Sequence, residues 1–73
     1  MNGAVVVLGE RARVAGFALA GATVLVAEDA DAARRHWRQL GGDVAVVVLT
    51  SAAAAAVAGL PPARRELLSV VMP

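Results

Sequence analysis

Residues 9–29 read GERARVAGFALAGATVLVAED, and the order of patterns around this stretch decides the class of fold. The apolar run Ala4–Leu8 precedes it, a helical pattern fills about Arg11–Ala20, and a second apolar run, Thr23–Ala27, ends in two acidic residues. Short, valine-rich runs are typical of strands that are buried on both faces. Gly21 stands where the C-terminus of a helix often needs a positive φ. The stretch therefore predicts a strand, a helix and a second strand.

The predicted helix has one apolar face and an internal glycine. Its apolar residues are spaced at i, i+3, i+4 and i+7, namely Val14, Phe17, Ala18 and Gly21. A glycine inside a helix costs about 1 kcal/mol relative to alanine. We therefore expect the helix to pack closely against the sheet at Gly16.

The alternation of helical and strand patterns continues to the end of the chain. A second helix is predicted to begin at Asp29 or Asp31 and to run to about Leu40, and a strand follows at Val44–Leu49. A third helix is predicted to begin at Thr50 or Ser51 and to run to about Ala58. The last predicted elements are a helical turn at Ala63–Glu66 and a strand at Leu67–Met72. Short loops between alternating elements favour right-handed crossovers and a parallel sheet. The sequence thus predicts a single small Rossmann-like or receiver-like α/β domain over residues 1–73, with a four-stranded parallel sheet and helices on both faces.

Composition limits the kinds of partner. The 73 residues include no cysteine, which excludes disulfides and thiolate metal sites, and seven arginines against six acids leave a net charge of +1. That balance does not indicate a nucleic-acid partner. Residues 44–63 carry no charge and are long enough to suggest a membrane-spanning helix, but Thr50-Ser51 and Pro61-Pro62 interrupt the run. We expect a strand and a short helix there, and no insertion into a membrane.

The polar residues at the predicted strand ends do not match a nucleotide or phosphate site. Ligands of such sheets bind beyond the carboxyl ends of the strands, which here supply Gly9, Glu10, Glu28, Asp29, Thr50 and Ser51. A dinucleotide fingerprint would need a glycine at Arg11, and the chain has no lysine for a phosphate-binding loop. A phosphoacceptor receiver would carry an aspartate at the end of the third strand, where this chain has Leu49-Thr50. We therefore expect no cofactor, no catalytic residue and no small-molecule substrate.

Two groups of charged residues remain candidates for a role. Glu28 and Asp29 could bind a metal or act in acid–base chemistry, but acids at a helix N-terminus also stabilise the helix dipole, and we expect that role here. His36 lacks a second ligand at metal spacing, so no metal site is expected, and Trp37 is expected in the core. A possible partner interface would combine the two acids with the exposed arginines of the second helix, Arg34, Arg35 and Arg38.

The opening stretch also resembles a family signature. Gly16-Phe17-Ala18-Leu19-Ala20-Gly21 resembles the GF-x-LAG signature of the F subunit of archaeal and vacuolar-type (V/A-type) rotary ATPases, which closes the first helix in that family. The segments Thr23–Asp29, Asp43–Thr50 and Val70–Pro73 are similar to the strands that follow in the family. The likeness spans nearly all of the chain.

The resemblance implies a protein that performs no chemistry of its own. Members of the family are small α/β domains of the central stalk, on the cytoplasmic side of the membrane, that bind the coiled-coil D subunit and neighbouring stalk subunits and turn with the rotor. The signature residues would then be structural, and they are Gly16, Phe17, Leu19, Ala20 and Gly21. Some relatives modulate ATPase activity through a mobile C-terminal helix, a role that is not assigned to this chain because it ends at Pro73.

The sequence departs from the family in two places, and two other interpretations stay open. Ala18 stands where many members carry a basic residue, and the third predicted helix is nearly all alanine, so we expect exposed apolar surface on it. A small-ligand-binding or degenerate receiver-like regulatory module would use Gly9, Glu28 and Thr50. A fragment of a larger α/β enzyme would have its sites elsewhere.

Overall fold

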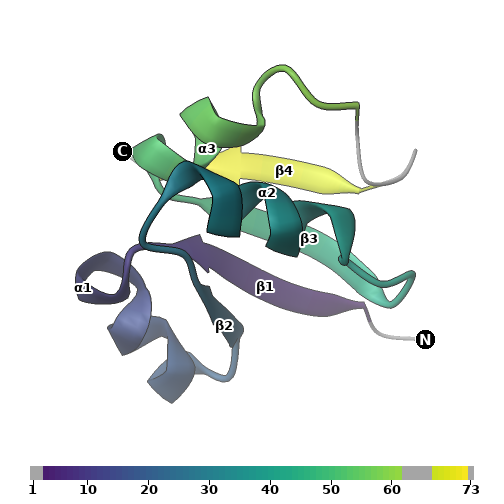
Figure 1. Ribbon diagram of the computed structural model, residues 1–73. Coiled ribbons are helices and arrows are strands. Elements are labelled where there is room, and N and C mark those ends of the chain that lie inside the picture. Colours follow the sequence, from purple (N-terminus) through teal and green to yellow (C-terminus); the bar gives the residue numbers. More distant parts are fainter. Residues whose placement is uncertain (1–2, 62–66, 73) are drawn as a thin grey trace.

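The computed structural model describes residues 3–61 and 67–72, and it confirms the predicted order of elements (Figure 1). The strands are β1 (Ala4–Gly9), β2 (Thr23–Val26), β3 (Val44–Leu49) and β4 (Leu68–Val71). The helices are α1 (Arg11–Val14), the 3₁₀ helix η1 (Ala15–Ala20), α2 (Ala30–Arg38) and α3 (Ser51–Val57). These strands form one four-stranded sheet in the order β2-β1-β3-β4, and every neighbouring pair is parallel. The predicted helical turn at Ala63–Glu66 lies outside the described residues.

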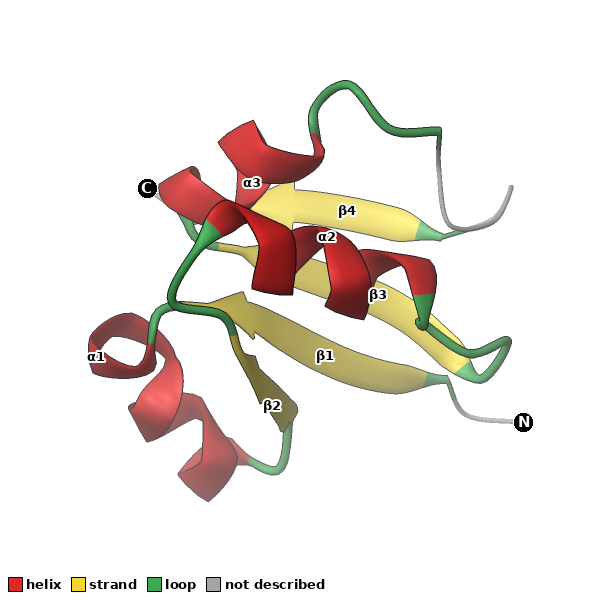
Figure 2. Cartoon of the chain, in the orientation of Figure 1, coloured by secondary structure: helices red, strands yellow, loops and turns green. Residues whose placement is uncertain are grey.

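The helices cover the two faces of the sheet unequally (Figure 2). On one face, α2 and α3 pack against each other, α2 also contacts β1 and β2, and α3 contacts β1 and β3. α1 and η1 lie on the other face, near β1 and β2. Right-handed crossovers require this division, because the step from β1 to β2 runs across the sheet in the direction opposite to the later steps. As a consequence, η1 contacts β2, at the edge of the sheet opposite to β4.

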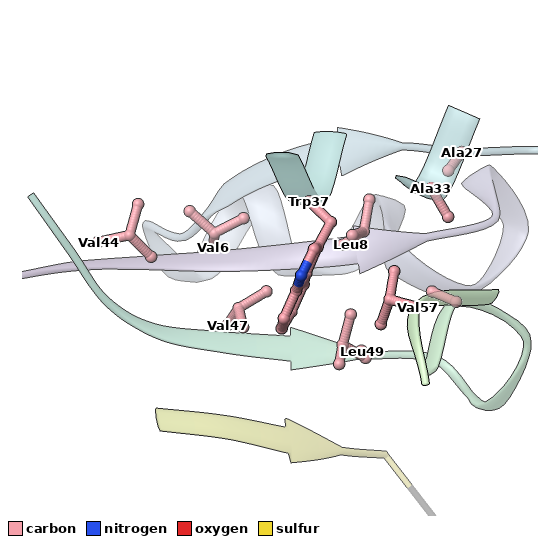
Figure 3. Packing of buried hydrophobic residues seen from close by; sticks show 10 residues of the cluster. Val6, Leu8, Ala27, Ala33, Trp37, Val44, Val47, Leu49 and Val57 are labelled. Carbon is pink, nitrogen blue, oxygen red and sulfur yellow. The ribbon is translucent and has the colours of Figure 1, made fainter. Parts of the chain in front are cut away.

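The main core lies between the sheet and the pair α2 and α3 (Figure 3). Its buried side chains include Val6 and Leu8 of β1, Val47 and Leu49 of β3, Ala33 and Trp37 of α2, and Ala53 and Val57 of α3. Trp37 is buried, as predicted, and its Nε1–H donates a hydrogen bond to the Pro61 carbonyl at 3.0 Å. A buried indole needs such a partner, and this one ties α2 to the loop that follows α3.

The first predicted helix is tighter than expected. It is α-helical only over Arg11–Val14 and continues as a 3₁₀ helix with three residues per turn, so the expected apolar stripe is broken. Val14 is fully buried, whereas Phe17 stays 38% exposed. The predicted close approach at Gly16 is wrong, because a Cβ placed there would meet no described atom within 4 Å.

Gly21 ends η1 as predicted. Its φ is 90°, in the left-handed region that side chains other than glycine rarely adopt. The Gly21 N–H donates to the Ala18 carbonyl at 3.2 Å, and the Ala22 N–H donates to the Phe17 carbonyl at 3.3 Å. These two bonds form a Schellman motif, which satisfies the last carbonyls of the helix.

The residue that caps each of the later helices is now defined. Asp29 caps α2, because its Oδ1 accepts a hydrogen bond from the Ala32 N–H at 2.8 Å. Thr50 caps α3, because its Oγ1 accepts from the Ala53 N–H at 3.3 Å. In each case the first of the two predicted candidates is the cap, and the second lies inside the helix.

The uncharged segment that suggested a membrane span is divided between two elements. β3 occupies Val44–Leu49 and α3 occupies Ser51–Val57, as the interruption at Thr50-Ser51 predicted. Across the described residues, no helix combines the length and the apolar character that crossing a bilayer would need.

Candidate functional site

The carboxyl ends of β1, β2 and β3 meet at one edge of the sheet, where a hollow of about 190 Å³ opens. Three carboxylates and five alanines line it: Glu10, Glu28, Asp29, Ala27, Ala30, Ala33, Ala52 and Ala53. The structure thus brings together acids that are far apart in sequence, because parallel strands end at the same edge. This is the position at which an α/β sheet would bind a ligand.

A buried threonine holds this edge together. Thr50 is 0% exposed, and its Oγ1–H donates to Glu10 Oε1 at 2.5 Å while the same oxygen caps α3. Its hydroxyl therefore acts both as donor and as acceptor. Gly9 stands opposite, where an added Cβ would lie 2.2 Å from the Thr50 Cγ2. The space that Gly9 leaves is filled by a side chain of the same chain.

The other two carboxylates of the hollow lie at helix starts. Glu28 Oε2 accepts a hydrogen bond from the Arg11 N–H at 2.9 Å, at the first residue of α1. Asp29 caps α2 through the Ala32 N–H. The first N–H groups of a helix have no partner within it, so these acids satisfy donors that would otherwise need water. The role expected from the sequence, at the start of the helix that follows the two acids, is confirmed for Asp29, whereas Glu28 satisfies the N-terminus of α1 instead.

The contacts of Glu10 at this edge shift its titration. The hydrogen bond from Thr50 lowers the pKa of Glu10 below its ordinary value of 4.5. Its backbone N–H and the charge of Arg13 lower the pKa further, and desolvation opposes them. Glu10 is therefore ionised at neutral pH, which favours the short hydrogen bond from Thr50.

The chemistry of the hollow does not favour an anionic ligand. A nucleotide or phosphate at this edge would face three carboxylates, and like charges repel strongly at short range. Among residues 3–61 and 67–72, no group of three histidine, cysteine or acidic side chains could hold a metal ion. His36, the single histidine, lies with its Nε2 at 3.1 Å from the Val26 carbonyl oxygen.

The arginines of α2 divide into a structural one and two exposed ones. Arg34 Nη1 pairs with the Asp31 carboxylate at 2.9 Å, and Arg34 Nε donates to the Ala56 carbonyl at 3.2 Å. Arg34 therefore links α2 to α3. Arg35 and Arg38 are exposed on α2, which lies over the core face of the sheet.

A second surface, which the sequence analysis missed, lies on the opposite face of the sheet. The register pairs Val5 with Val46 and Val46 with Leu68, and it pairs Val48 with Val70, so these side chains share one face. Leu68 is 58% exposed, Val5 44% and Val70 43%. We call Val5, Val46, Val48, Leu68 and Val70 the open strip. Beside it lies a hollow of about 440 Å³ that Val5, Val48 and Phe17 help to line.

The sequence carried only part of the signal for the open strip. Valine-rich strands indicated burial on both faces, but not which strands the helices would leave uncovered. The expected exposed surface on the alanine-rich helix is present in part, since Ala52, Ala55 and Ala58 are exposed. The large exposed apolar side chains, however, belong to β1, η1 and β4.

The comparison with protein families identifies the chain. Residues 5–72 match the model of the family described as ATP synthase (F/14-kDa) subunit. Comparisons with curated proteins and with solved structures gave no match. The matched range includes the whole signature Gly16–Gly21 and all the helices, so the resemblance stated from the sequence is confirmed. The chain therefore belongs to the family of the ATP synthase (F/14-kDa) subunit, which comprises the non-catalytic F subunits in the stalk of the V/A-type rotary ATPases.

Proposed function

We propose that this chain is a central-stalk (rotor) subunit that binds the coiled-coil D subunit and helps to transmit or regulate rotation coupled to ion transport. The observation that carries the proposal is membership of the family over residues 5–72. The proposal takes residues 1–73 as one α/β domain that resembles the N-terminal domain of the F subunit. It places the chain next to other stalk subunits, on the cytoplasmic side of the membrane.

The edge at the strand ends supports this non-catalytic role. Gly9, Glu10 and Thr50 occupy the place where an α/β enzyme holds its ligand, and each makes contacts inside the chain. Glu28 and Asp29 satisfy helix N-termini. The residues that fold-level analogy would assign to a ligand therefore have a structural use.

The connections between α2 and α3 suit a body that must keep its shape while it turns. Arg34 joins the two helices through the Ala56 carbonyl, and Trp37 joins α2 to the loop after α3 through Pro61. Both links lie on the covered face of the sheet, around a closely packed core. Close-packed interiors have low compressibility, so a load applied at one surface is transmitted through them.

Co-purification with the D subunit of the same organism tests the proposal. The two chains are co-expressed and separated by size-exclusion chromatography with light scattering, and an unrelated two-stranded coiled coil of equal length serves as the control. We expect a one-to-one complex with the D subunit and none with the control. A chain that keeps its circular dichroism spectrum but elutes apart from the D subunit at micromolar concentrations would contradict the proposal.

The regulatory part of the proposal needs a second readout. ATP hydrolysis by the catalytic head bound to the D subunit is measured with and without this chain. A change in rate that follows occupancy of the D subunit supports regulation. An unchanged rate at full occupancy limits the role to a structural member of the rotor.

The sequence-based interface is a starting point for locating the contact. It consists of Glu28, Asp29, Arg34, Arg35 and Arg38. The first three interact within the chain, so changing them alters the fold as well as any contact. Arg35 and Arg38 are exposed, and charge reversal at these two residues tests the set without that complication.

A further inference from the structure

We propose that the open strip is the surface that receives the partner, and that its occupant is a single α-helix with an uncharged apolar stripe, contributed by the coiled-coil D subunit. This inference rests on the function proposed above and names the contact surface and its chemistry. Parallel sheets are generally covered on both faces. Here η1 contacts β2, whereas the open strip runs over β1, β3 and β4 and leaves Leu68 58% exposed.

The width of the open strip matches one helix. Neighbouring strands of a sheet are about 4.8 Å apart, so the distance from β1 across β3 to β4 is about 10 Å. An α-helix with its side chains has a diameter of about 10–12 Å. Two rows of side chains cross the strip, Val5–Val46–Leu68 and the shorter Val48–Val70, which stops at β3 because its neighbour on β1, Val7, is buried. Such rows can contact apolar residues on successive turns of a helix.

The surroundings of the open strip define the chemistry of that helix. Phe17 of η1 is 38% exposed and lines the adjoining hollow together with Val5 and Val48. Of the described residues that line this hollow, none carries a charge. A lysine or glutamate in the centre of the docked face would therefore lose its hydration without gaining a partner. The docking helix must carry apolar residues outside the seam that joins it to its own coiled-coil partner.

The area of the open strip favours a helix over a second copy of this chain. Four apolar side chains on this face are more than a third exposed, namely Val5, Phe17, Leu68 and Val70, whereas Val46 and Val48 are half-buried. A stable symmetric dimer buries about 800 Å² on each partner. The strip is too small to hold two copies together by itself. A long coiled coil can rest one helix on the strip and make further contacts beyond it.

Cysteine footprinting on both faces of β4 tests the inference, because the chain has no cysteine of its own. Leu68→Cys places a thiol on the open strip, and Val71→Cys places one on the opposite face of the same strand, where the native side chain is 52% exposed. The rate of modification by a maleimide is followed by peptide mass spectrometry, with and without a saturating amount of the D subunit. We expect the D subunit to slow modification at position 68 by about tenfold or more and to leave position 71 unchanged, since exposure governs access to the thiol.

Three outcomes would count against the inference, and they differ from one another. A one-to-one complex in which positions 68 and 71 react as fast as in the free chain overturns the inference and leaves the proposed function standing. The absence of any complex overturns both. Protection of position 68 that grows with the concentration of this chain alone, without the D subunit, assigns the strip to a second copy instead.

An affinity measurement with matched variants supplies an independent arm. Val70→Lys places a charge on the open strip, and Val71→Lys places one on the opposite face of β4. The native side chains are similarly exposed, at 43% for Val70 and 52% for Val71. We expect Val70→Lys to weaken binding of the D subunit by about 30-fold, as for loss of an apolar anchor, and Val71→Lys to have little effect. Equal melting temperatures confirm that both variants fold. A larger loss of affinity for Arg35→Glu than for Val70→Lys would place the contact on α2 and refute the inference.

Discussion

Gly9 offers the sharpest test of how this fold uses its strand ends. In a nucleotide-binding fold, a glycine at the end of the first strand leaves room for a phosphate. Here the space is filled by Thr50, and a Cβ at position 9 would lie 2.2 Å from its Cγ2 and 2.5 Å from its Oγ1. The φ of Gly9 is not positive, so the glycine is required for space and not for its backbone conformation.

The cost of Gly9→Ala follows from these distances. Thr50 is fully buried and bonded to Glu10 and Ala53, so it cannot move away without losing those bonds. Overpacking of a tight site costs about 1–3 kcal/mol. Loss of a helix cap adds about 1 kcal/mol. We expect Gly9→Ala to lower the free energy of unfolding by about 2–4 kcal/mol, a large share of the total for a chain of this size.

Urea unfolding followed by the fluorescence of Trp37 measures this cost, because the single tryptophan is only 6% exposed in the folded chain. Gly16→Ala is the matched control, since an added Cβ there meets no described atom within 4 Å. We expect Gly16→Ala to keep or raise the stability, by up to about 1 kcal/mol. Equal losses for Gly9→Ala and Gly16→Ala would refute the steric argument.

A double-mutant cycle identifies the clashing group. Thr50→Ser removes the Cγ2 and keeps the hydroxyl that donates to Glu10 and caps α3. It should therefore cost less in the Gly9→Ala background than in the wild type, with a coupling of about 1 kcal/mol or more. Additive losses would show that the clash is not with the Cγ2 but with the Oγ1 and Cβ that serine keeps, at 2.5 and 2.9 Å. Nucleotide binding that depends on Gly9 would contradict the structural role directly.

Three further perturbations test other parts of the structure. Thr50→Val should lower the free energy of unfolding by about 1–3 kcal/mol in urea titrations, because a buried cap is lost and Glu10 is left without its donor. Folding lowers the pKa of Glu10, so its ionised form adds stability above pH 4.5 that is lost as the pH falls through the folded-state pKa. Thr50→Val removes the main cause of that lowered pKa. The loss of stability between pH 6 and about pH 3 should therefore be smaller in Thr50→Val than in the wild type. Gly21→Ala should cost about 1 kcal/mol or more in melting experiments, since its φ is 90°; an unchanged melting temperature would show that η1 can end in another way. Trp37→Phe should cost about 1–3 kcal/mol by chemical unfolding monitored by circular dichroism, because the core loses volume and the Pro61 carbonyl loses its donor.

The resemblance to a nucleotide-binding start has a physical explanation. In this chain, a strand that ends in glycine, followed by a helix and a second strand with an acidic end, serves close packing and the satisfaction of helix N-termini. Gly9 accommodates Thr50, and Glu28 satisfies the N-terminus of α1. The chain differs from a dinucleotide-binding sequence at Arg11, where the dinucleotide fingerprint requires a glycine.

The sequence by itself was sufficient for the order of elements, the parallel sheet and the family. Strand and helix periods, and breakers such as Gly21 and Pro61-Pro62, act over a few residues, so they can be read without the tertiary structure. The burial of Trp37 and the left-handed turn at Gly21 were predicted for the same reason. For each later helix, the sequence narrowed the N-cap to two nearby residues. The residue that caps α3, Thr50, also makes a contact across the molecule, with Glu10.

The remaining features depend on residues that are distant in sequence and were decided only by the tertiary structure. Gly9 and Thr50 meet because β1 and β3 are neighbours, and Gly16 is unconstrained because η1 turns as a 3₁₀ helix. The open strip arises from the register that aligns Val46 with Leu68 and from the position of η1 beside β2. A hydrophobic period shows that a side chain lies on one face of a strand, but whether that face is covered depends on where the other elements pack.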